Sequence, residues 1–214
     1  LNHFTAIKCN HRHGDIRVLI DYETETIYQL HNPPRAIIAD NEIWDTLREL
    51  KDQTKIAHYG ISIGDPAEGI LAIEKGDVET IQVVYNLLER SAAKELFALA
   101  EQKSVGIIAR VPLASGLLTG KYKPGHQFAD NDHRKDVYGG DKLEKTLARV
   151  EQLRFLTEDT GRTPAQAAIK FCLAHPAVSV VIPGCKTPEQ ALENVLAAAA
   201  LDLTQEELKR IEEI

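Results

Sequence analysis

The sequence has few of the features that point to a membrane, a disulfide framework or a metal ion. It has no methionine, only three cysteines, and no apolar run near the roughly 18–20 residues of a membrane span. Cys9, Cys172 and Cys185 form no CxxC pair, so neither disulfides nor a zinc site is indicated. His11 and His13 in NHRHGD supply too few ligands for a metal ion. We predict no metal, no membrane partner and, without a signal-type segment at the start, a cytoplasmic location.

Basic residues are outnumbered as well. The chain has 25 Lys and Arg against 32 Asp and Glu, with a formal net charge of −7. A nucleic-acid partner usually requires a basic surface, so we predict none and expect a small-molecule partner. The length of 214 residues, with 43% hydrophobic and 27% charged residues, is typical of a single soluble domain. Nothing in the sequence predicts the oligomeric state.

Short runs rich in Val, Ile and Tyr alternate with amphipathic stretches. The runs predict strands at 4–8, 26–30, 56–61, 80–85, 105–111 and 178–182. The stretches predict helices near 42–52, 66–75, 91–103, 142–158, 164–174, 188–199 and 204–213. Asp65, Thr163 and Thr187 each precede a proline, which is typical of an N-cap followed by the first helical residue. Gln166 and Gln190 stand three residues after their threonines, where a capping box places them.

This alternation predicts an α/β protein with a parallel sheet covered by helices, either an open sheet or a closed barrel. No GxGxxG and no GxxxxGK[ST] follows the early strands, which disfavours a nucleotide-binding open sheet. A barrel is favoured because it gathers the polar residues at the strand ends on one face. Two segments are irregular: 9–25 is short for a helical crossover, and 112–140 is a long, glycine-rich loop of the kind that covers a site.

Four motifs resemble the aldo-keto reductase family, and they occur in that family's order. They are FTAIKC, YQLHNP, IIARVPLASGLLTGKY and VVIPGCKTPEQALENV. The resemblance implies a (β/α)8 TIM-type barrel, incomplete in this sequence, with strands three to eight present. According to this resemblance, residues 1–214 are one aldo-keto reductase-like domain that lacks the first two βα units, and 112–140 is the cofactor or lid loop. The stretch 15–26 departs from the family, which has a full helix before the histidine strand.

The resemblance implies hydride transfer from NADPH to an aldehyde or ketone. In the family a tyrosine is the general acid, with its pKa lowered by a lysine and a histidine; Lys8 and His31 match the last two. The tyrosine and an acidic partner belong to the two strands that this sequence lacks. We therefore expect an NADP-dependent reductase in the intact parent, and the alternative is a non-catalytic NADP-binding regulatory or scaffold protein. By its sequence alone, His31 is equally a half-buried histidine at a strand end.

The resemblance also assigns a cofactor site. Ser62 and Gln82 match the nicotinamide-amide contacts, and Arg110 stands where many members stack an aromatic ring, which a planar guanidinium can replace. The family has asparagine after Ser62 where this chain has Ile63. The remaining cofactor-binding residues fall in the last two motifs: Pro112, Leu113, Ser115 and Gly116 at the pyrophosphate, Gly184, Lys186 and Gln190 at the 2'-phosphate, and Glu193 and Asn194 at the adenine. Gln190 replaces a frequent arginine, which weakens the preference for NADP.

Overall fold

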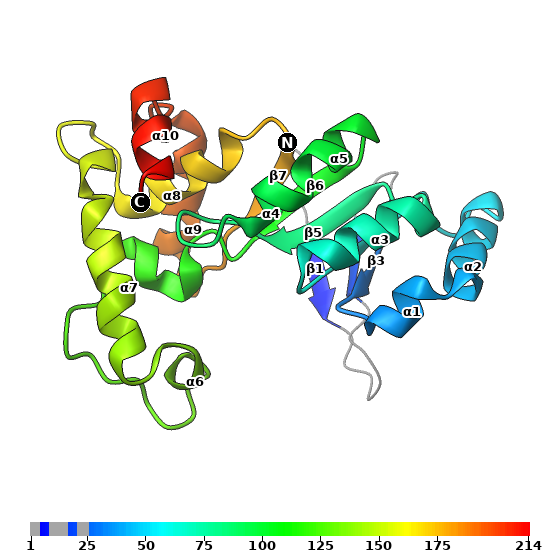
Figure 1. The fold of residues 1–214 in the computed structure, drawn as a ribbon, viewed down its shortest axis with the longest axis horizontal. Helices are drawn as coiled ribbons and strands as arrows, with labels where there is room; N and C mark the ends of the chain where they lie inside the picture. Colours follow the sequence, from blue (N-terminus) through cyan, green and yellow to red (C-terminus); the bar gives the residue numbers. More distant parts are fainter. Residues whose placement is uncertain (1–4, 9–16, 21–25) are drawn as a thin grey trace. The chain divides into compact units, whose positions relative to one another are not determined.

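The computed structural model describes the backbone of residues 5–8, 17–20 and 26–214 (Figure 1). His11 and His13 lie outside the described residues. The chain divides into two compact units: the first comprises Leu1–Val84 and Ser91–Ile108, and the second comprises Tyr85–Arg90 and Ala109–Ile214. None of the described helices is both long and apolar enough to cross a membrane.

The first unit alternates strands with helices. Its elements are β1 (Thr5–Lys8), β2 (Arg17–Ile20), β3 (Thr26–His31), α1 (Arg35–Ala39), α2 (Asn41–Asp52), β4 (His58–Ser62), α3 (Pro66–Gly76), β5 (Thr80–Val84), α4 (Ser91–Glu95), α5 (Phe97–Gln102) and β6 (Gly106–Arg110), whose last two residues belong to the second unit. The expected helix over 91–103 is interrupted at Leu96, and the sequence did not predict α1.

The sheet is only partly parallel, which corrects the prediction. Strands β3, β4 and β5 pair in parallel as expected, but β2 pairs antiparallel with both β1 and β3. The run RVLI at 17–20 forms this unpredicted strand. Because β2 returns between them, β1 and β3 run in the same direction without a helical crossover. Segment 9–25, predicted to be short for a helical crossover, contains β2, and with this returning strand no helical crossover is needed.

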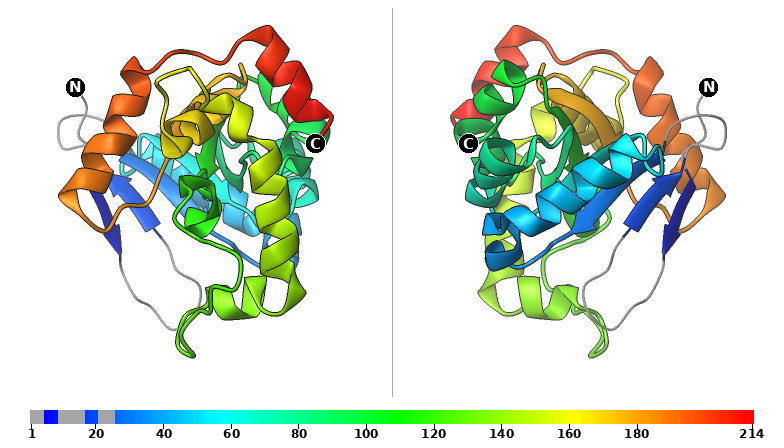
Figure 2. Two further views of the ribbon diagram at one scale, coloured as in Figure 1. Left: turned by 90° about the vertical axis from the view of Figure 1, so that its left-hand side faces the viewer. Right: turned by 90° about the vertical axis from the view of Figure 1, so that its right-hand side faces the viewer.

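The two faces of the parallel strands differ in chemistry. Leu30, Ile61 and Ile81 lie in one register row and are buried. Helices of the same unit lie along the sheet (Figure 2). Trp44 of α2 is fully buried in the same core and donates from Nε1 to the Ile38 carbonyl at 2.8 Å. A Cβ on Gly76 would lie 2.5 Å from the indole ring, so only glycine lets α3 approach Trp44 this closely. The opposite face of the strands carries polar residues.

The second unit is mostly helical. It contains the 3₁₀ segments η1 (Ala114–Thr119), η2 (Arg154–Leu156) and η3 (Ala197–Ala199), strand β7 (Val178–Ile182), and helices α6 (Arg134–Tyr138), α7 (Asp141–Gln152), α8 (Pro164–Leu173), α9 (Pro188–Leu196) and α10 (Gln205–Glu212).

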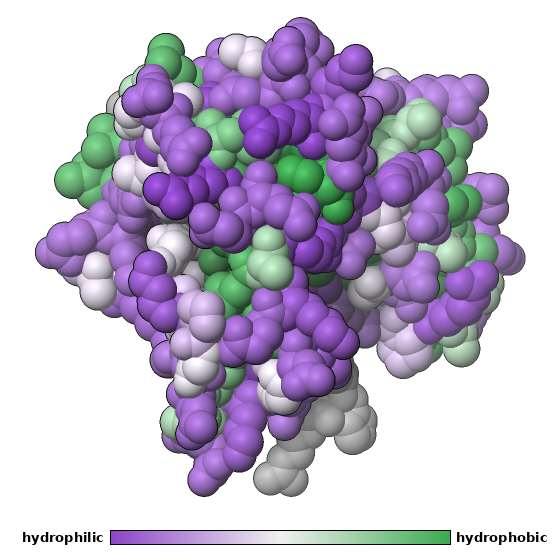
Figure 3. Space-filling view, turned by 60° about the vertical axis from the view of Figure 1, so that its left-hand side comes forward, coloured by the Kyte–Doolittle hydropathy of each residue, from purple (hydrophilic) through white to green (hydrophobic). Residues whose placement is uncertain are grey.

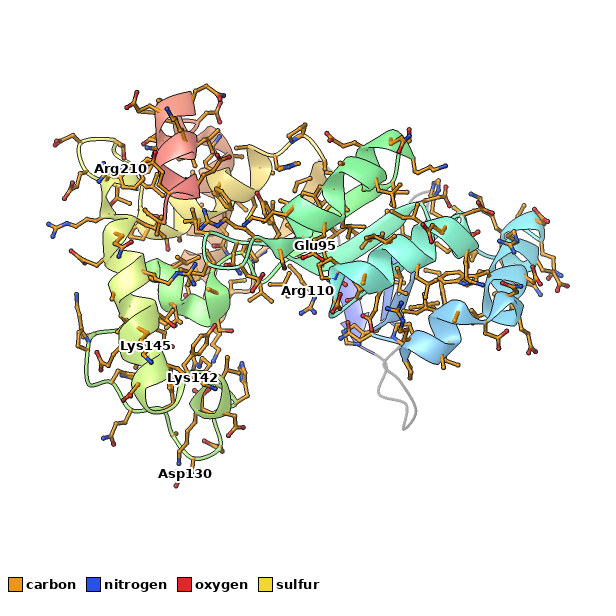
Figure 4. The ribbon with its side chains drawn as sticks, viewed as in Figure 1. Glu95, Arg110, Asp130, Lys142, Lys145 and Arg210 are labelled. Carbon is orange, nitrogen blue, oxygen red and sulfur yellow. The ribbon has the colours of Figure 1, made fainter. Side chains whose placement is uncertain are left out.

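Packing and ion pairs fix the helices of the second unit. The Arg210 guanidinium of α10 lies 3.9 Å from the centre of the Phe155 ring (Figure 4). The buried Arg162 side chain donates to the Leu156 carbonyl at 2.9 Å and pairs with Glu207. Burial raises the pKa of the Cys172 thiol to about 12, so the thiol keeps its proton at neutral pH. Apolar side chains also reach the surface, among them Leu192, Val195, Leu196 and Leu201, and Figure 3 shows such areas between hydrophilic ones.

The predicted helix starts are largely confirmed. Asp65 caps α3 and Thr163 caps α8, each within a complete capping box. Thr187 caps α9, but the Gln190 side chain accepts from the Lys186 N–H at 2.8 Å, so no complete box is seen there. Thr204 caps α10 in a box that the sequence analysis did not predict.

Candidate functional site

Three of the predicted site residues form one row at the carboxyl ends of neighbouring strands. His31 on β3 is in register with Ser62 on β4, and Ser62 is in register with Gln82 on β5. Residues in register on parallel strands share a face of the sheet, so these side chains lie on the polar face. Ser62 is fully buried, whereas His31 and Gln82 are half-buried. The strand ends thus bring a histidine, a hydroxyl and a carboxamide together.

The turn after His31 is held against the neighbouring strand. Asn32 has a left-handed backbone, with φ of 46°, and its N–H donates to the Ser62 carbonyl at 2.9 Å. The Ser62 hydroxyl donates to Asn32 Oδ1 at 3.2 Å. Asparagine tolerates this conformation better than most residues, and the two prolines after it turn the chain away from the sheet. The reason for NPP after the histidine is therefore structural, and it fixes where β3 ends.

A second polar row lies one step deeper on the same face. Gln29 is buried, is in register with Gly60, and donates from Nε2 to the Thr80 hydroxyl. A Cβ on Gly60 would lie 2.1 Å from Thr80 Oγ1, so the bond needs a glycine between the two strands. Lys8 of β1 is in register with Arg17 of β2, and Arg17 is in register with Gln29, so the backbone of Lys8 belongs to this row. The side chain of Lys8 lies outside the described residues.

The amino ends of the strands carry a separate charged cluster. Glu79 accepts from Lys51 Nζ at 2.8 Å and contacts His58 Nδ1 at 2.7 Å. Partial burial raises the pKa of the Glu79 carboxyl, but the bonds to Lys51 and His58 outweigh it, so the pKa lies below its ordinary value. These side chains tie α2, β4 and β5 together. His58 is therefore a structural histidine, at the other end of the strands from His31.

In the second unit, the predicted pyrophosphate residues lie in one strained turn. It begins after Arg110, which is half-buried at the end of β6 (Figure 4), and includes the buried Pro112 and the half-buried Leu113. Val111, Ala114 and Ser115 have φ of 56°, 46° and 56°, and Gly116 has φ of 94°. Left-handed backbone in non-glycine residues costs of order 1–3 kcal/mol each and occurs where a site requires a fixed shape.

The predicted 2'-phosphate and adenine residues follow β7. Gly184 has open space where a Cβ would stand, and Lys186 is exposed just before the Thr187 cap of α9. Glu193 accepts from the Thr163 hydroxyl at 2.7 Å, so it also joins α9 to the start of α8. Asn194 is half-buried beside it in the sequence. An exposed ammonium at a helix N-terminus is chemically suited to a phosphate.

Sequence reasoning missed several residues that shape these sites. Asn32 holds the turn after His31. Lys121 packs closely against Gly116, where a Cβ would lie 2.9 Å from Lys121 Nζ. Arg134 and Tyr138 contact Ser115. The signal for Asn32 was its place between a strand and two prolines. Arg134 and Tyr138 carried no local signal, since they lie about 20 residues from the turn in the sequence.

A cavity of about 580 Å³ lies within the second unit, next to η1. Leu117 and Leu118 of η1 line it together with Leu147, Leu153 and Leu156. None of the predicted site residues of this unit lines it. The described residues contain no group of three or more histidine, cysteine, aspartate or glutamate side chains placed to hold a metal ion.

Parallel strands that alternate with helices and carry polar residues at their carboxyl ends define an α/β protein. A model of the Aldo/keto reductase family matches residues 18–214, and the chain belongs to this family. The resemblance found from the four motifs is thereby confirmed.

Individual relatives agree with this assignment. The chain is 32% identical to the uncharacterized oxidoreductase YqkF of Bacillus subtilis over 87% of this chain and 58% of that protein. A glycerol dehydrogenase of Gluconobacter oxydans has a similar fold, with a TM-score of 0.77 and 24% identity over 98% of this chain and 69% of that one. An aldo-keto reductase of Bacillus halodurans in its holo form gives a TM-score of 0.70 and 28% identity over 87% of this chain and 59% of that one. The chain spans little more than half the length of the curated relatives it matches.

Proposed function

We propose that the intact protein is an NADPH-dependent oxidoreductase that reduces an aldehyde or ketone to an alcohol. The observation that carries this proposal is the row of His31, Ser62 and Gln82 at the carboxyl ends of β3, β4 and β5. This is the edge at which barrel enzymes place their reacting groups. Family membership and an oxidoreductase relative support the same class of reaction.

The residues present fit a nicotinamide dinucleotide. Ser62 and Gln82 offer a hydroxyl and a carboxamide of the kind that bind an amide, and Ser115 and Gly116 offer small residues in a fixed turn for a pyrophosphate. Lys186 offers a cation for a further phosphate. When bound, the nicotinamide supplies the hydride.

The chain's own residues prepare the carbonyl. The His31 imidazole, at the end of β3, donates a hydrogen bond to the carbonyl oxygen and stabilises the negative charge that develops there. Lys8 lowers the pKa of the proton-donating phenol that the family supplies from another strand. Arg110 stacks its planar guanidinium on the nicotinamide.

The proposal is tested with the intact protein, NADPH and a panel of aldehydes and ketones. We expect NADPH fluorescence to change on binding, and NADPH absorbance to fall when a carbonyl is added. His31→Gln should lower kcat by about two to four powers of ten, because the donor to the carbonyl oxygen is displaced. It should leave the Kd for NADPH within about threefold, since His31 is assigned to the substrate.

Two results would contradict the assignment. Unchanged kcat in His31→Gln would make His31 a structural residue of the strand end. Tight NADPH binding without turnover of any carbonyl in the panel would instead favour the non-catalytic regulatory protein that the sequence left as the alternative.

A further inference from the structure

Ser115 is held from two sides by one short helix. Arg134, the first residue of α6, donates from Nη1 to the Ser115 carbonyl at 3.4 Å. Tyr138, the last residue of α6, shares a hydrogen bond with the Ser115 side chain. The two contacts fix both the backbone and the hydroxyl of a residue whose φ is 56°. The helix thus contacts the turn at one of its residues with left-handed backbone.

Arg134 is itself locked in place. Its Nε donates to both oxygens of Asp132, at 2.8 and 3.0 Å, and its own backbone N–H donates to Asp132 Oδ1 at 3.0 Å. Its Nη1 donates to the Tyr122 hydroxyl, and the guanidinium lies 5.2 Å from the centre of the Phe128 ring. The Arg134 guanidinium holds the pKa of the Asp132 carboxyl well below its usual range. With four partners around it, the guanidinium keeps one orientation at neutral pH.

The turn needs such a support. A serine and an alanine in left-handed backbone are each unfavourable and persist only where surrounding contacts determine them. Conversely, a helix of five residues is unstable alone and depends on its tertiary contacts. Figure 1 shows α6 followed directly by α7, and both belong to the second unit. The turn and α6 therefore stabilise each other.

Tyr138 also holds the Ser115 hydroxyl. Burial raises the pKa of the Tyr138 phenol, an effect that the contact with Ser115 offsets only in part, so the phenol keeps its proton at neutral pH. A serine hydroxyl has one donor and two acceptor sites. The hydrogen bond with Tyr138 thus fixes the position of the Ser115 hydroxyl oxygen in the turn.

We propose that α6 is a positioning element for the pyrophosphate turn, with Tyr138 orienting the Ser115 hydroxyl and Arg134 fixing the Ser115 carbonyl. This inference rests on the proposed function, because the turn is assigned to a dinucleotide. Neither residue touches the reacting atoms. Their effect should therefore fall on cofactor binding, with little effect on the hydride transfer step.

The test compares Tyr138→Phe and Arg134→Lys with Val137→Ala, a control on the same helix whose side chain is 51% exposed. Three quantities are measured in the intact protein: the Kd for NADPH by fluorescence titration, amide hydrogen exchange over 113–119 without cofactor, and the midpoint of thermal unfolding. Loss of one hydrogen bond should raise the Kd about three- to tenfold in Tyr138→Phe. Arg134→Lys keeps the charge but loses the planar fork, so it should raise the Kd at least as much.

We expect faster exchange over 113–119 in both variants and none of these changes in Val137→Ala. The thermal midpoint should stay within about 2 °C, and kcat at saturating NADPH should be unchanged. A fall in the thermal midpoint that parallels the loss of affinity would mean that α6 only stabilises the fold, and would overturn the inference.

The two proposals fail in different ways. If the unchanged protein does not bind NADPH, the proposed function is wrong. If the unchanged protein binds NADPH and both variants bind it equally well, with unchanged exchange in the turn, only the role of α6 is wrong.

Discussion

A single lysine side chain sets the expected preference between the two nicotinamide cofactors. Lys186 is exposed immediately before the capped start of α9. Only NADPH carries the 2'-phosphate assigned to this cation, and a charge-assisted bond is worth roughly 1.5–3 kcal/mol. Lys186→Glu should therefore weaken NADPH binding about 10- to 150-fold and leave NADH binding within about threefold.

Fluorescence titration with both cofactors measures this preference. Lys142→Glu is the matched control, because Lys142 is an exposed lysine on α7 that makes the same change in charge (Figure 4). Equal losses for NADPH and NADH in Lys186→Glu would show that Lys186 acts only through the general field of the protein.

Two histidines, His31 and His58, have different surroundings that their residue type does not predict. His31 and His58 both belong to strands and are both half-buried. The structure separates them, because His31 ends β3 in the row of Ser62 and Gln82 whereas His58 begins β4 in an ion pair with Glu79. Their surroundings, and not their residue type, distinguish a candidate catalytic group from a structural one.

Among the elements, α8 depends most clearly on the residue that caps its N-terminus. The Thr163 hydroxyl accepts from the Gln166 N–H at 3.2 Å and donates to Glu193 at 2.7 Å, so one side chain caps α8 and holds α9. Thr163→Ala should lower the free energy of unfolding by about 1–2 kcal/mol, since a cap alone is worth about 0.5–2 kcal/mol. Thr163→Ser should retain most of this stability, because serine keeps the hydroxyl.

Urea denaturation followed by circular dichroism measures this loss. Thr146→Ala is the control, because Thr146 lies within α7 and its hydroxyl donates only to the Lys142 carbonyl of its own helix. We expect Thr146→Ala to be neutral or slightly stabilising. A similar loss in both alanine variants would assign the effect to the threonine side chain in general and not to the cap.

At the scale of the whole molecule, acid should destabilise the fold through paired carboxyls in both units. The pKa of Glu79 is lowered as described above. For Glu207, partial burial raises the pKa, but bonds from the Thr204 backbone and from Arg162 outweigh it. The unfolded chain therefore binds protons first, near the ordinary glutamate pKa of about 4.3, and the folded state binds them at lower pH.

The free energy of unfolding should accordingly be level above about pH 6 and fall as the pH drops through this range. Urea denaturation at a series of pH values tests the slope. Glu79→Gln should be less stable at neutral pH and should flatten the curve, and Glu207→Gln should do the same. Parallel curves for the unchanged protein and Glu79→Gln would show that the Glu79 pairs contribute nothing to the pH dependence.

The local features of this protein were predictable from its sequence. Apolar runs with β-branched residues predicted six of the strands within one or two residues, and cap residues such as Asp65 and Thr163 predicted the helix starts. These features depend on neighbours within about four residues, so a linear pattern contains them. The four motifs also identified the family.

The contacts between residues far apart in the sequence depend on the tertiary structure. The pairing of β2 with β1 and β3, the register of His31 with Ser62 and Gln82, and the contact of Tyr138 with Ser115 all join residues far apart in the sequence. RVLI can form a strand or part of a helix, and hydrogen bonds to two neighbouring strands decide the choice. Likewise, the left-handed backbone of Ser115 is unfavourable locally and exists because distant side chains hold it.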